Sequence, residues 1–112
     1  MRKNCSQVVL ENFFEPCVLY LLLKKNSYGY ELYQNLQKFC KCNVNMGNLY
    51  RGLNRLNKNG NISKIKMKSA KGPDKIIYSL SEKGRNYLND WIENLEKQQA
   101  VISSLITNYK NL

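Results

Sequence analysis

The hydrophobic period of the chain changes at Gly60, and this change limits the fold more than any other feature. Residues 46–59 repeat apolar side chains at the spacing of an amphipathic helix, and Gly60 is a typical left-handed stop after such a helix. Residues 61–68 then alternate apolar and polar side chains, while residues 75–80 are rich in β-forming types. A Gly-Pro-Asp turn at 72–74 separates the two segments. The pattern predicts one helix followed directly by a basic β-hairpin.

Three further helices are expected around this helix and hairpin. Pro16 suits the first turn of a helix that is apolar on most sides and ends near Asn26. Ser27 is expected to cap a second helix that reaches residues 39–40. Ser81 is expected to cap a last helix, along which apolar residues recur at helical spacing over most of the remaining chain. The predicted fold class is mainly α with a small β-hairpin, arranged as a winged helix-turn-helix plus a long C-terminal helix.

The positive charge is concentrated in the first two thirds of the chain. The 112 residues carry 18 Lys and Arg against 8 Asp and Glu, a formal net charge of +10. Residues 1–60 hold nine basic and three acidic side chains, residues 61–80 hold five and one, and residues 81–112 hold four and four. A basic folded unit followed by a neutral segment is typical of a polyanion-binding module with a separate tail. We therefore expect a winged helix-turn-helix DNA-binding domain at 1–80 and a C-terminal dimerisation helix at 81–112.

The residue types that the chain lacks exclude several classes of protein. It contains no His, which removes the commonest general base near neutral pH and the commonest metal ligand. The sequence also shows no phosphate-cradling Gly loop and no clustered acid–base pair, so an enzyme, a metal site and a cofactor are not expected. No apolar run approaches the roughly twenty residues that span a bilayer, and the N-terminal residues lack a signal-peptide pattern. We expect a cytoplasmic protein without membrane contact.

The four Cys residues leave two alternatives open. Cys5, Cys17, Cys40 and Cys42 are expected to be thiols in a reducing cytosol, because a chain of this size does not need disulfides. The closely spaced Cys40 and Cys42 are compatible with a metal site or a redox switch, although a structural zinc site needs four ligands. Ordinary buried or half-exposed thiols are the simpler interpretation.

The polar face of the 46–59 helix carries side chains that suit DNA reading. A major groove about 12 Å wide admits one helix, and its base edges are bound by Arg and Asn side chains. Arg51 and Arg55 stand on this face one turn apart, and they are two of only four Arg in the chain. Asn gives weaker support, because Asn occurs sixteen times. A merely solvated helix face is the alternative interpretation.

The hairpin lysines are expected to contact backbone phosphates or the minor groove beside that helix. Protection of an edge strand from aggregation is the alternative interpretation. Gly47 allows backbone N–H groups to approach a phosphate, and Tyr50 reaches one from the flank. Tyr28 either packs between helices or touches a phosphate. The predicted DNA-contacting residues are Tyr28, Gly47, Asn48, Tyr50, Arg51, Asn54, Arg55, Lys58, Lys64, Lys66, Lys68, Lys71 and Lys75.

The apolar stripe of the last helix is expected to need a partner. An isolated helix that projects from a small domain cannot bury such a stripe by itself. The same helix of a second copy is the simplest partner, and a dimer places two recognition helices on two half-sites of a pseudo-palindrome. The predicted dimerisation residues are Phe13, Phe14, Leu88, Trp91, Ile92, Leu95, Ile102, Leu105 and Ile106.

Several short motifs occur in a fixed order along the chain. They are Glu15-Pro16, the YGYEL string at 28–32, the GNLYR string at 47–51, and a segment from Gly72-Pro73 through Tyr78 and Leu80-Ser81 to Gly84. In this combination the chain resembles the PadR family of bacterial transcriptional regulators over about residues 12–95. The resemblance implies a homodimeric repressor whose third helix lies in the major groove with the wing beside it. The C-terminal helix then serves as the dimer arm, and the single short helix is similar to that of the small-subtype members.

The resemblance also bears on two individual residues. Many relatives carry Thr at the position of Asn48, so at the first turn of the reading helix this chain departs from the family pattern, and the resemblance does not define the contact made there. Some members bind planar aromatic ligands between paired Trp side chains at the dimer centre. Trp91 is the only Trp of the chain and is therefore a candidate for an effector pocket, although it lies about two turns earlier than that pocket requires. Packing in the dimer core is the alternative role for Trp91.

The hypothesis from the sequence is a homodimeric, PadR-like repressor that binds a pseudo-palindromic operator in double-stranded DNA. An unknown signal, such as a small-molecule effector, is expected to release it. The alternative is a winged-helix interaction protein with an acidic partner, or a non-specific nucleic-acid binder.

Overall fold

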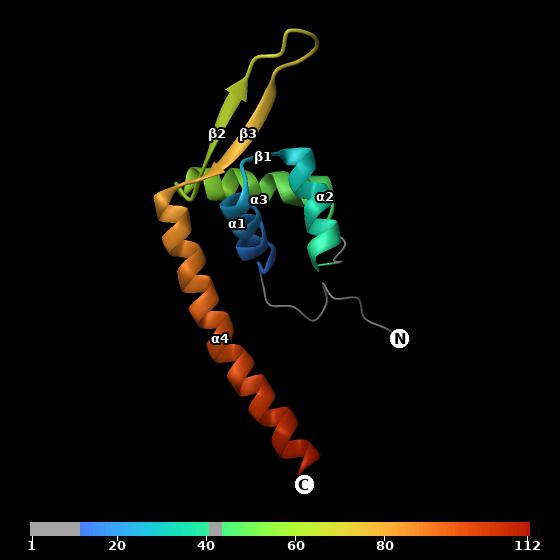
Figure 1. The fold of residues 1–112 in the computed structure, drawn as a ribbon, viewed down its shortest axis with the longest axis vertical. Helices are drawn as coiled ribbons and strands as arrows, with labels where there is room; N and C mark the ends of the chain where they lie inside the picture. The colour runs from blue at the N-terminus through green and yellow to red at the C-terminus, as the bar shows by residue number, and fades with distance from the viewer. Residues whose placement is uncertain (1–11, 41–43) are drawn as a thin grey trace.

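The computed structural model describes residues 12–40 and 44–112, which fold into four helices and one small sheet. Three short helices form a compact unit, from which a β-hairpin projects on one side while the long C-terminal helix leaves below it (Figure 1). This is the winged-helix arrangement, so the predicted fold class is confirmed. The elements are α1 (Phe14–Lys24), β1 (Ser27–Tyr28), α2 (Gly29–Cys40), α3 (Met46–Lys58), β2 (Ile62–Met67), β3 (Lys75–Leu80) and α4 (Glu82–Lys110).

A single apolar core lies between the first three helices and the base of the wing. The predicted apolar stripe of α3 is buried at Leu49, Leu53 and Leu56. Each fully buried leucine stabilises the fold by about 1.5–3 kcal/mol, which explains why α3 is held so firmly on its neighbours. The buried apolar residues are Cys17, Val18, Leu19, Leu22, Leu32, Leu36, Leu49, Leu53, Leu56, Ile62, Tyr78 and Leu88.

Local signals set both ends of α3. At its start the Asn45 side-chain oxygen accepts a hydrogen bond from the Asn48 N–H at 2.7 Å, which satisfies one of the free donors of the first turn. This cap was not predicted from the sequence. At its end Gly60 has φ +83°, a conformation that favours glycine, and the Asn61 N–H returns to the Leu56 carbonyl at 2.9 Å. The predicted stop at Gly60 is confirmed.

The predicted role of Ser27 as the cap of the second helix is wrong. Ser27 and Tyr28 form β1, which pairs antiparallel with β3, and the sheet therefore has three strands in the order β1-β3-β2. Helix α2 begins at Gly29, where the Glu31 carboxylate accepts the Tyr28 N–H at 2.8 Å. That contact is the half of a capping box made by the third helical residue, and it replaces the expected Ser cap. The Ser27 hydroxyl donates instead to the Lys25 carbonyl at 3.1 Å.

The wing is a regular antiparallel hairpin. Its register runs from Ile62 opposite Leu80 to Met67 opposite Lys75. Only the base of the wing enters the core, because every β2 residue after Ile62 is exposed. The hairpin therefore extends into solvent as a narrow basic projection.

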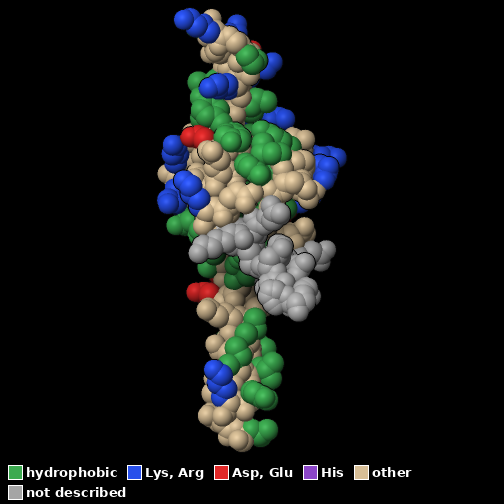
Figure 2. Space-filling model, turned by 90° about the vertical axis from the view of Figure 1, so that its right-hand side faces the viewer, with side chains coloured by type: hydrophobic (Ala, Val, Ile, Leu, Met, Phe, Trp, Pro, Cys, Tyr) green, Lys and Arg blue, Asp and Glu red, His purple; other side chains and the backbone are tan. Residues whose placement is uncertain are grey.

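Helix α4 is the longest element, with 29 residues. Ser81 caps it as predicted, since its hydroxyl accepts the Gly84 N–H at 3.0 Å. Only Gly84 and Leu88 of α4 are buried, and both lie in its first turns. Figure 2 shows an apolar stripe that continues down the free part of the helix. Within the described residues no helix combines the length and apolar character that a membrane span requires.

Candidate nucleic-acid interface

The polar face of α3 is open to solvent, opposite the buried leucine stripe. Gly47, Asn48, Arg51, Asn54 and Lys58 are all exposed. The Arg51 guanidinium donates a hydrogen bond to the Asn48 side-chain oxygen, so these two predicted reading residues form a pair on the first two turns. The first turn carries no acidic residue, which leaves the positive end of the helix available to an anion. The sequence prediction of an exposed polar face is therefore confirmed for these five residues.

A pocket of about 550 Å³ lies between strand β3 of the wing, the start of α2 and Tyr50 of α3. Tyr28 and Tyr50, both predicted to flank the DNA, line it together with Lys75. The Lys75 ammonium lies 5.4 Å from the centre of the Tyr28 ring, within reach of a cation–π interaction. Two carboxylates, Glu31 and Asp74, also line the pocket. The fold thus brings together three predicted DNA-contacting residues that are far apart in the sequence.

Tyr78 forms the buried wall of the same pocket. Burial raises the pKa of its phenol above the ordinary value of 10.0, and the neighbouring Tyr50 phenol raises it further. The hydroxyl is therefore protonated at neutral pH and is available as a hydrogen-bond donor. Tyr78 was named from the sequence only as part of the PadR-like motif and not as a site residue, because a single Tyr in a β-forming segment gives no sign of its neighbours.

The hairpin register divides the predicted lysines between two faces of the wing. Side chains alternate across a strand, so Lys64 and Lys66 project from one face, while Lys75 projects from the other with Met67. Lys68 and Lys71 lie in the exposed loop between β2 and β3. All five are exposed. Their DNA contacts stay a prediction, and the register shows that they do not form one flat basic surface.

Arg55 makes contacts that differ from those of Arg51. Its Nε and Nη2 groups donate to the Glu15 Oε2 atom at 3.3 and 3.2 Å, and its guanidinium lies 5.8 Å from the centre of the Phe14 ring. Glu15 is only 5% exposed, and its other oxygen accepts the Tyr87 hydroxyl at 2.7 Å. We call Glu15, Arg55 and Tyr87 the Glu15 cluster. It joins one residue each from α1, α3 and α4.

Magnitudes indicate how firmly Arg55 is held. Removing one partner of a buried ion pair costs about 3–5 kcal/mol, because the other charge is left buried and unpaired. The Arg55 side chain is 46% exposed, so water reduces that cost. A good contact between Arg and a guanine edge contributes about 1–3 kcal/mol. The two magnitudes are thus of similar size, and the predicted DNA contact of Arg55 remains untested.

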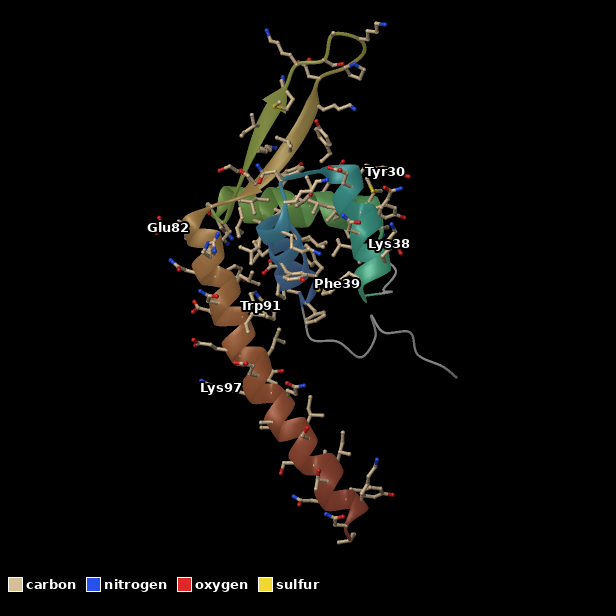
Figure 3. The ribbon with its side chains drawn as sticks, in the orientation of Figure 1. Tyr30, Lys38, Phe39, Glu82, Trp91 and Lys97 are labelled. Atoms are coloured by element: carbon tan, nitrogen blue, oxygen red, sulfur yellow. The ribbon has the colours of Figure 1, made fainter. Side chains whose placement is uncertain are left out.

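Trp91 lies on the side of α4 that faces α1, one turn beyond Tyr87 (Figure 3). Burial is the main cause that raises the pKa of the Tyr87 phenol above 10.0, and the hydrogen bond to Glu15 adds to it. A hydrogen bond from Trp91 acts in the opposite direction, which places the indole beside the Glu15 cluster. Trp91 is half-buried in a single chain. Its predicted roles in a dimer core or an effector pocket stay predictions.

The predicted dimerisation residues fall into two groups. Phe13, Phe14 and Leu88 already pack in the core of their own chain, and the Phe14 ring lies directly against Gly52 of α3. The other predicted residues are half-buried or exposed along α4, from Trp91 and Ile92 through Leu95 to Ile102, Leu105 and Ile106. Leu88 is buried, while Phe13 and Phe14 keep part of their surface exposed, and the dimer contacts of both groups stay a prediction.

The structure does not test the metal and redox alternatives for Cys40 and Cys42. Among residues 12–40 and 44–112, no three His, Cys, Asp or Glu side chains gather as metal ligands would. Cys17 is buried in the core. Cys5, Cys42 and the side chain of Cys40 lie outside the described residues.

The comparisons with known proteins agree with this geometry. A model of the transcriptional regulator PadR-like family matches residues 18–90. The chain belongs to the PadR-like family. A PadR-like transcriptional regulator from Bacillus cereus is 28% identical, with a TM-score of 0.73, over 83% of this chain and 90% of that one. A Streptococcus transcriptional regulator is 29% identical, with a TM-score of 0.72, over 83% and 91% of the two chains.

The fold is also shared with a PadR from Bacillus subtilis whose structure was solved in complex with operator DNA. It is 23% identical, with a TM-score of 0.63, over 75% of this chain and 48% of that one. No curated protein gives a significant match to this sequence. The resemblance drawn from the sequence motifs is confirmed, and the family is one of transcriptional regulators.

Proposed function

We propose that this PadR-like protein is a sequence-specific DNA-binding repressor that acts as a homodimer on a pseudo-palindromic operator in double-stranded DNA. A signal that favours another arrangement of the two subunits releases it from the operator. The observation that carries the proposal is the open polar face of α3, which lies beside the basic wing and the tyrosine-lined pocket.

The reading face supplies different groups for different parts of DNA. Asn48, Arg51 and Asn54 are exposed side chains of the types that bind adenine and guanine edges. Gly47 and Lys58 lie near the two ends of α3, where phosphates of the groove walls are expected. The remaining phosphate contacts are proposed for Tyr28, Tyr50, Lys64, Lys66, Lys68, Lys71 and Lys75.

The homodimer is supported by the free half of α4. Val101, Ile102, Leu105, Ile106 and Tyr109 are between 48% and 75% exposed. Contiguous apolar surface of this kind is costly in water and usually marks an interface. The same helix from a second copy presents a matching stripe, and a two-fold axis then relates two reading helices.

Release is proposed to follow a shift between two arm arrangements. A ligand that binds one arrangement better than the other changes the spacing of the two reading helices and with it the affinity for DNA. Trp91 is the proposed ligand contact, because it is aromatic, half-buried and on the arm.

The proposal is tested by fluorescence anisotropy with duplex DNA from upstream of the protein's own gene. A scrambled duplex of equal composition is the control, and both are titrated at several salt concentrations. Tight binding to the first duplex alone, with one dimer per site near physiological salt, supports a specific regulator. Equal binding to both duplexes that disappears with salt indicates a non-specific binder. No binding to either turns the search toward an acidic protein partner of the basic face.

A further inference from the structure

We propose that Glu15 is a positioning residue for DNA recognition, and that Arg55 acts through Glu15 instead of on a base. The buried carboxylate holds the reading helix α3 and the arm α4 in one cluster and so sets the angle between them. In a dimer this angle decides the distance between the two reading helices. The inference rests on the proposed function for its DNA readout, but the cluster itself belongs to the single chain.

Both oxygens of the Glu15 carboxylate are used, and each by a different helix. Oε2 accepts two hydrogen bonds from Arg55 of α3, and Oε1 accepts one from Tyr87 of α4. A carboxylate that is 5% exposed needs such partners, because water cannot replace them. If one helix moves, the carboxylate must move with it or lose a bond to the other helix. The Glu15 carboxylate therefore couples the position of α3 to that of α4.

Close packing on both sides of the cluster limits other movements. One turn before Arg55, Gly52 leaves no room for a side chain because the Phe14 ring fills that space. Directly after Tyr87, Leu88 is buried in the core. Phe14 and Glu15 are neighbours at the start of α1. Phe14 packs against Gly52 of α3, and Glu15 accepts a hydrogen bond from Tyr87 of α4.

Arg51 is the natural control, because the sequence gives both arginines the same signal. It lies one turn before Arg55 on α3 and is exposed, and within the described residues its side chain forms a hydrogen bond only with Asn48 of its own helix. No ion pair connects Arg51 to another element within the described residues. Substituting the two residues in the same way separates a DNA contact from a positioning role.

The first experiment measures the fluorescence of Trp91, the only Trp, in the DNA-free full-length protein. Arg55→Gln and Glu15→Gln are expected to shift its emission maximum, because both disturb the hydroxyl of Tyr87 beside it. Arg51→Gln is expected to leave the emission unchanged. Circular dichroism confirms that each variant is folded, and Arg55→Lys, which keeps the charge but not the forked geometry, replaces Arg55→Gln if that variant unfolds. Wild-type emission in both cluster variants overturns the proposed link between α3 and α4.

The second experiment measures operator affinity against salt, with the duplex from upstream of the gene. Versions with one base pair added or removed between the half-sites are included. Arg55→Gln and Glu15→Gln are expected to change the preferred spacing and to keep the wild-type salt slope. Arg51→Gln is expected to lose about tenfold or more in affinity with the preferred spacing unchanged.

Two results of the second experiment overturn the inference. One is a salt slope reduced by about one, or discrimination lost at a single base pair, in Arg55→Gln while Glu15→Gln binds like the wild type. The other is an unchanged spacing preference in both cluster variants. If the wild type itself does not distinguish operator from scrambled DNA, the proposed function fails instead, and the Trp91 measurement alone decides whether the cluster couples the two helices.

Discussion

The two halves of α4 are one continuous helix but have different partners. The near half, from Glu82 to Trp91, is built into the winged-helix unit through Gly84, Leu88 and the Tyr87–Glu15 hydrogen bond. The far half, from Val101 onward, is exposed at every residue. This difference indicates that intrinsic helix propensity alone does not explain why the far half is helical. An exposed amphipathic helix is stabilised when its apolar stripe packs against another surface. We propose that this surface is the same helix of a second copy.

The largest expected effect comes from breaking the far half. Ile102→Asp together with Leu105→Asp places charges in the stripe, and the protein is expected to become a monomer by analytical ultracentrifugation. Because two linked half-sites bind about 10²–10⁴-fold more tightly than one, operator affinity is expected to fall by a factor in that range.

A matched control places the same charges on the opposite face of the same turns. Ser104→Asp together with Thr107→Asp is expected to keep the dimer, since these positions point away from the apolar stripe. A dimer that survives the Ile102→Asp and Leu105→Asp pair contradicts the proposed interface.

The next largest effect is expected from shortening one leucine side chain in each half of α4 and comparing the two variants. Leu88→Ala leaves a cavity in the core and is expected to lower the free energy of unfolding by about 2–5 kcal/mol in urea titrations. Leu105→Ala removes the same atoms from an exposed site. It is expected to leave the unfolding of the winged-helix unit unchanged and to weaken dimerisation instead. Equal destabilisation at low protein concentration would show that the far half also packs on its own chain.

A smaller effect is expected where α4 enters the unit. A Cβ at Gly84 would collide with the backbone carbonyl of Asn61, which cannot move without disturbing the start of β2. Gly84→Ala is therefore expected to lower the melting temperature, at a cost of about 1–3 kcal/mol. Ser103→Ala, in the far half, is the control and should leave the melting temperature at or above that of the wild type.

The smallest effect concerns Tyr87 at high pH. Its pKa is raised in the folded state by burial and by Glu15, so the fold favours the protonated phenol. The stability that this provides is fully present below the ordinary value of 10.0 and is lost as the pH rises through the folded value. Tyr87→Phe is expected to reduce the loss of stability above pH 10 by at most about 1.4 kcal/mol per pH unit, measured by denaturant unfolding. An unchanged pH dependence, with Tyr109→Phe as control, argues against a buried Tyr87 hydroxyl.

Elements with strong local signals were predictable from the sequence. The period of α3, the glycine stop at Gly60 and the Ser81 cap each depend on residues a few positions apart, and all three agree with the structure. The motifs that resemble the PadR family were also sufficient to name it. The two-residue strand β1 was not predictable, because a strand so short has no period and exists only through its pairing with β3.

The candidate site was predictable as a face but not in its contacts. A helical wheel places Arg51 and Arg55 on one polar surface, since it measures only the angle around one helix. In the structure the two arginines differ, because Glu15 is buried at the junction of three helices and pairs with Arg55 but not with Arg51. Glu15 lies forty residues before Arg55 in the chain. The pocket that joins Tyr28, Tyr50 and Tyr78 has the same origin, since β1, α3 and β3 meet only in the folded chain.

By itself the sequence determined the helices, the wing, the surplus of positive charge before residue 81 and the family. These follow from periodicity, caps and composition, which act over short distances along the chain. Only the tertiary structure decided which charged side chains are free and which are held, because a buried carboxylate selects its partners by proximity in space. It also decided where along α4 the packing against the winged-helix unit ends, since burial of Leu88 and exposure of Leu105 depend on what lies beside the helix.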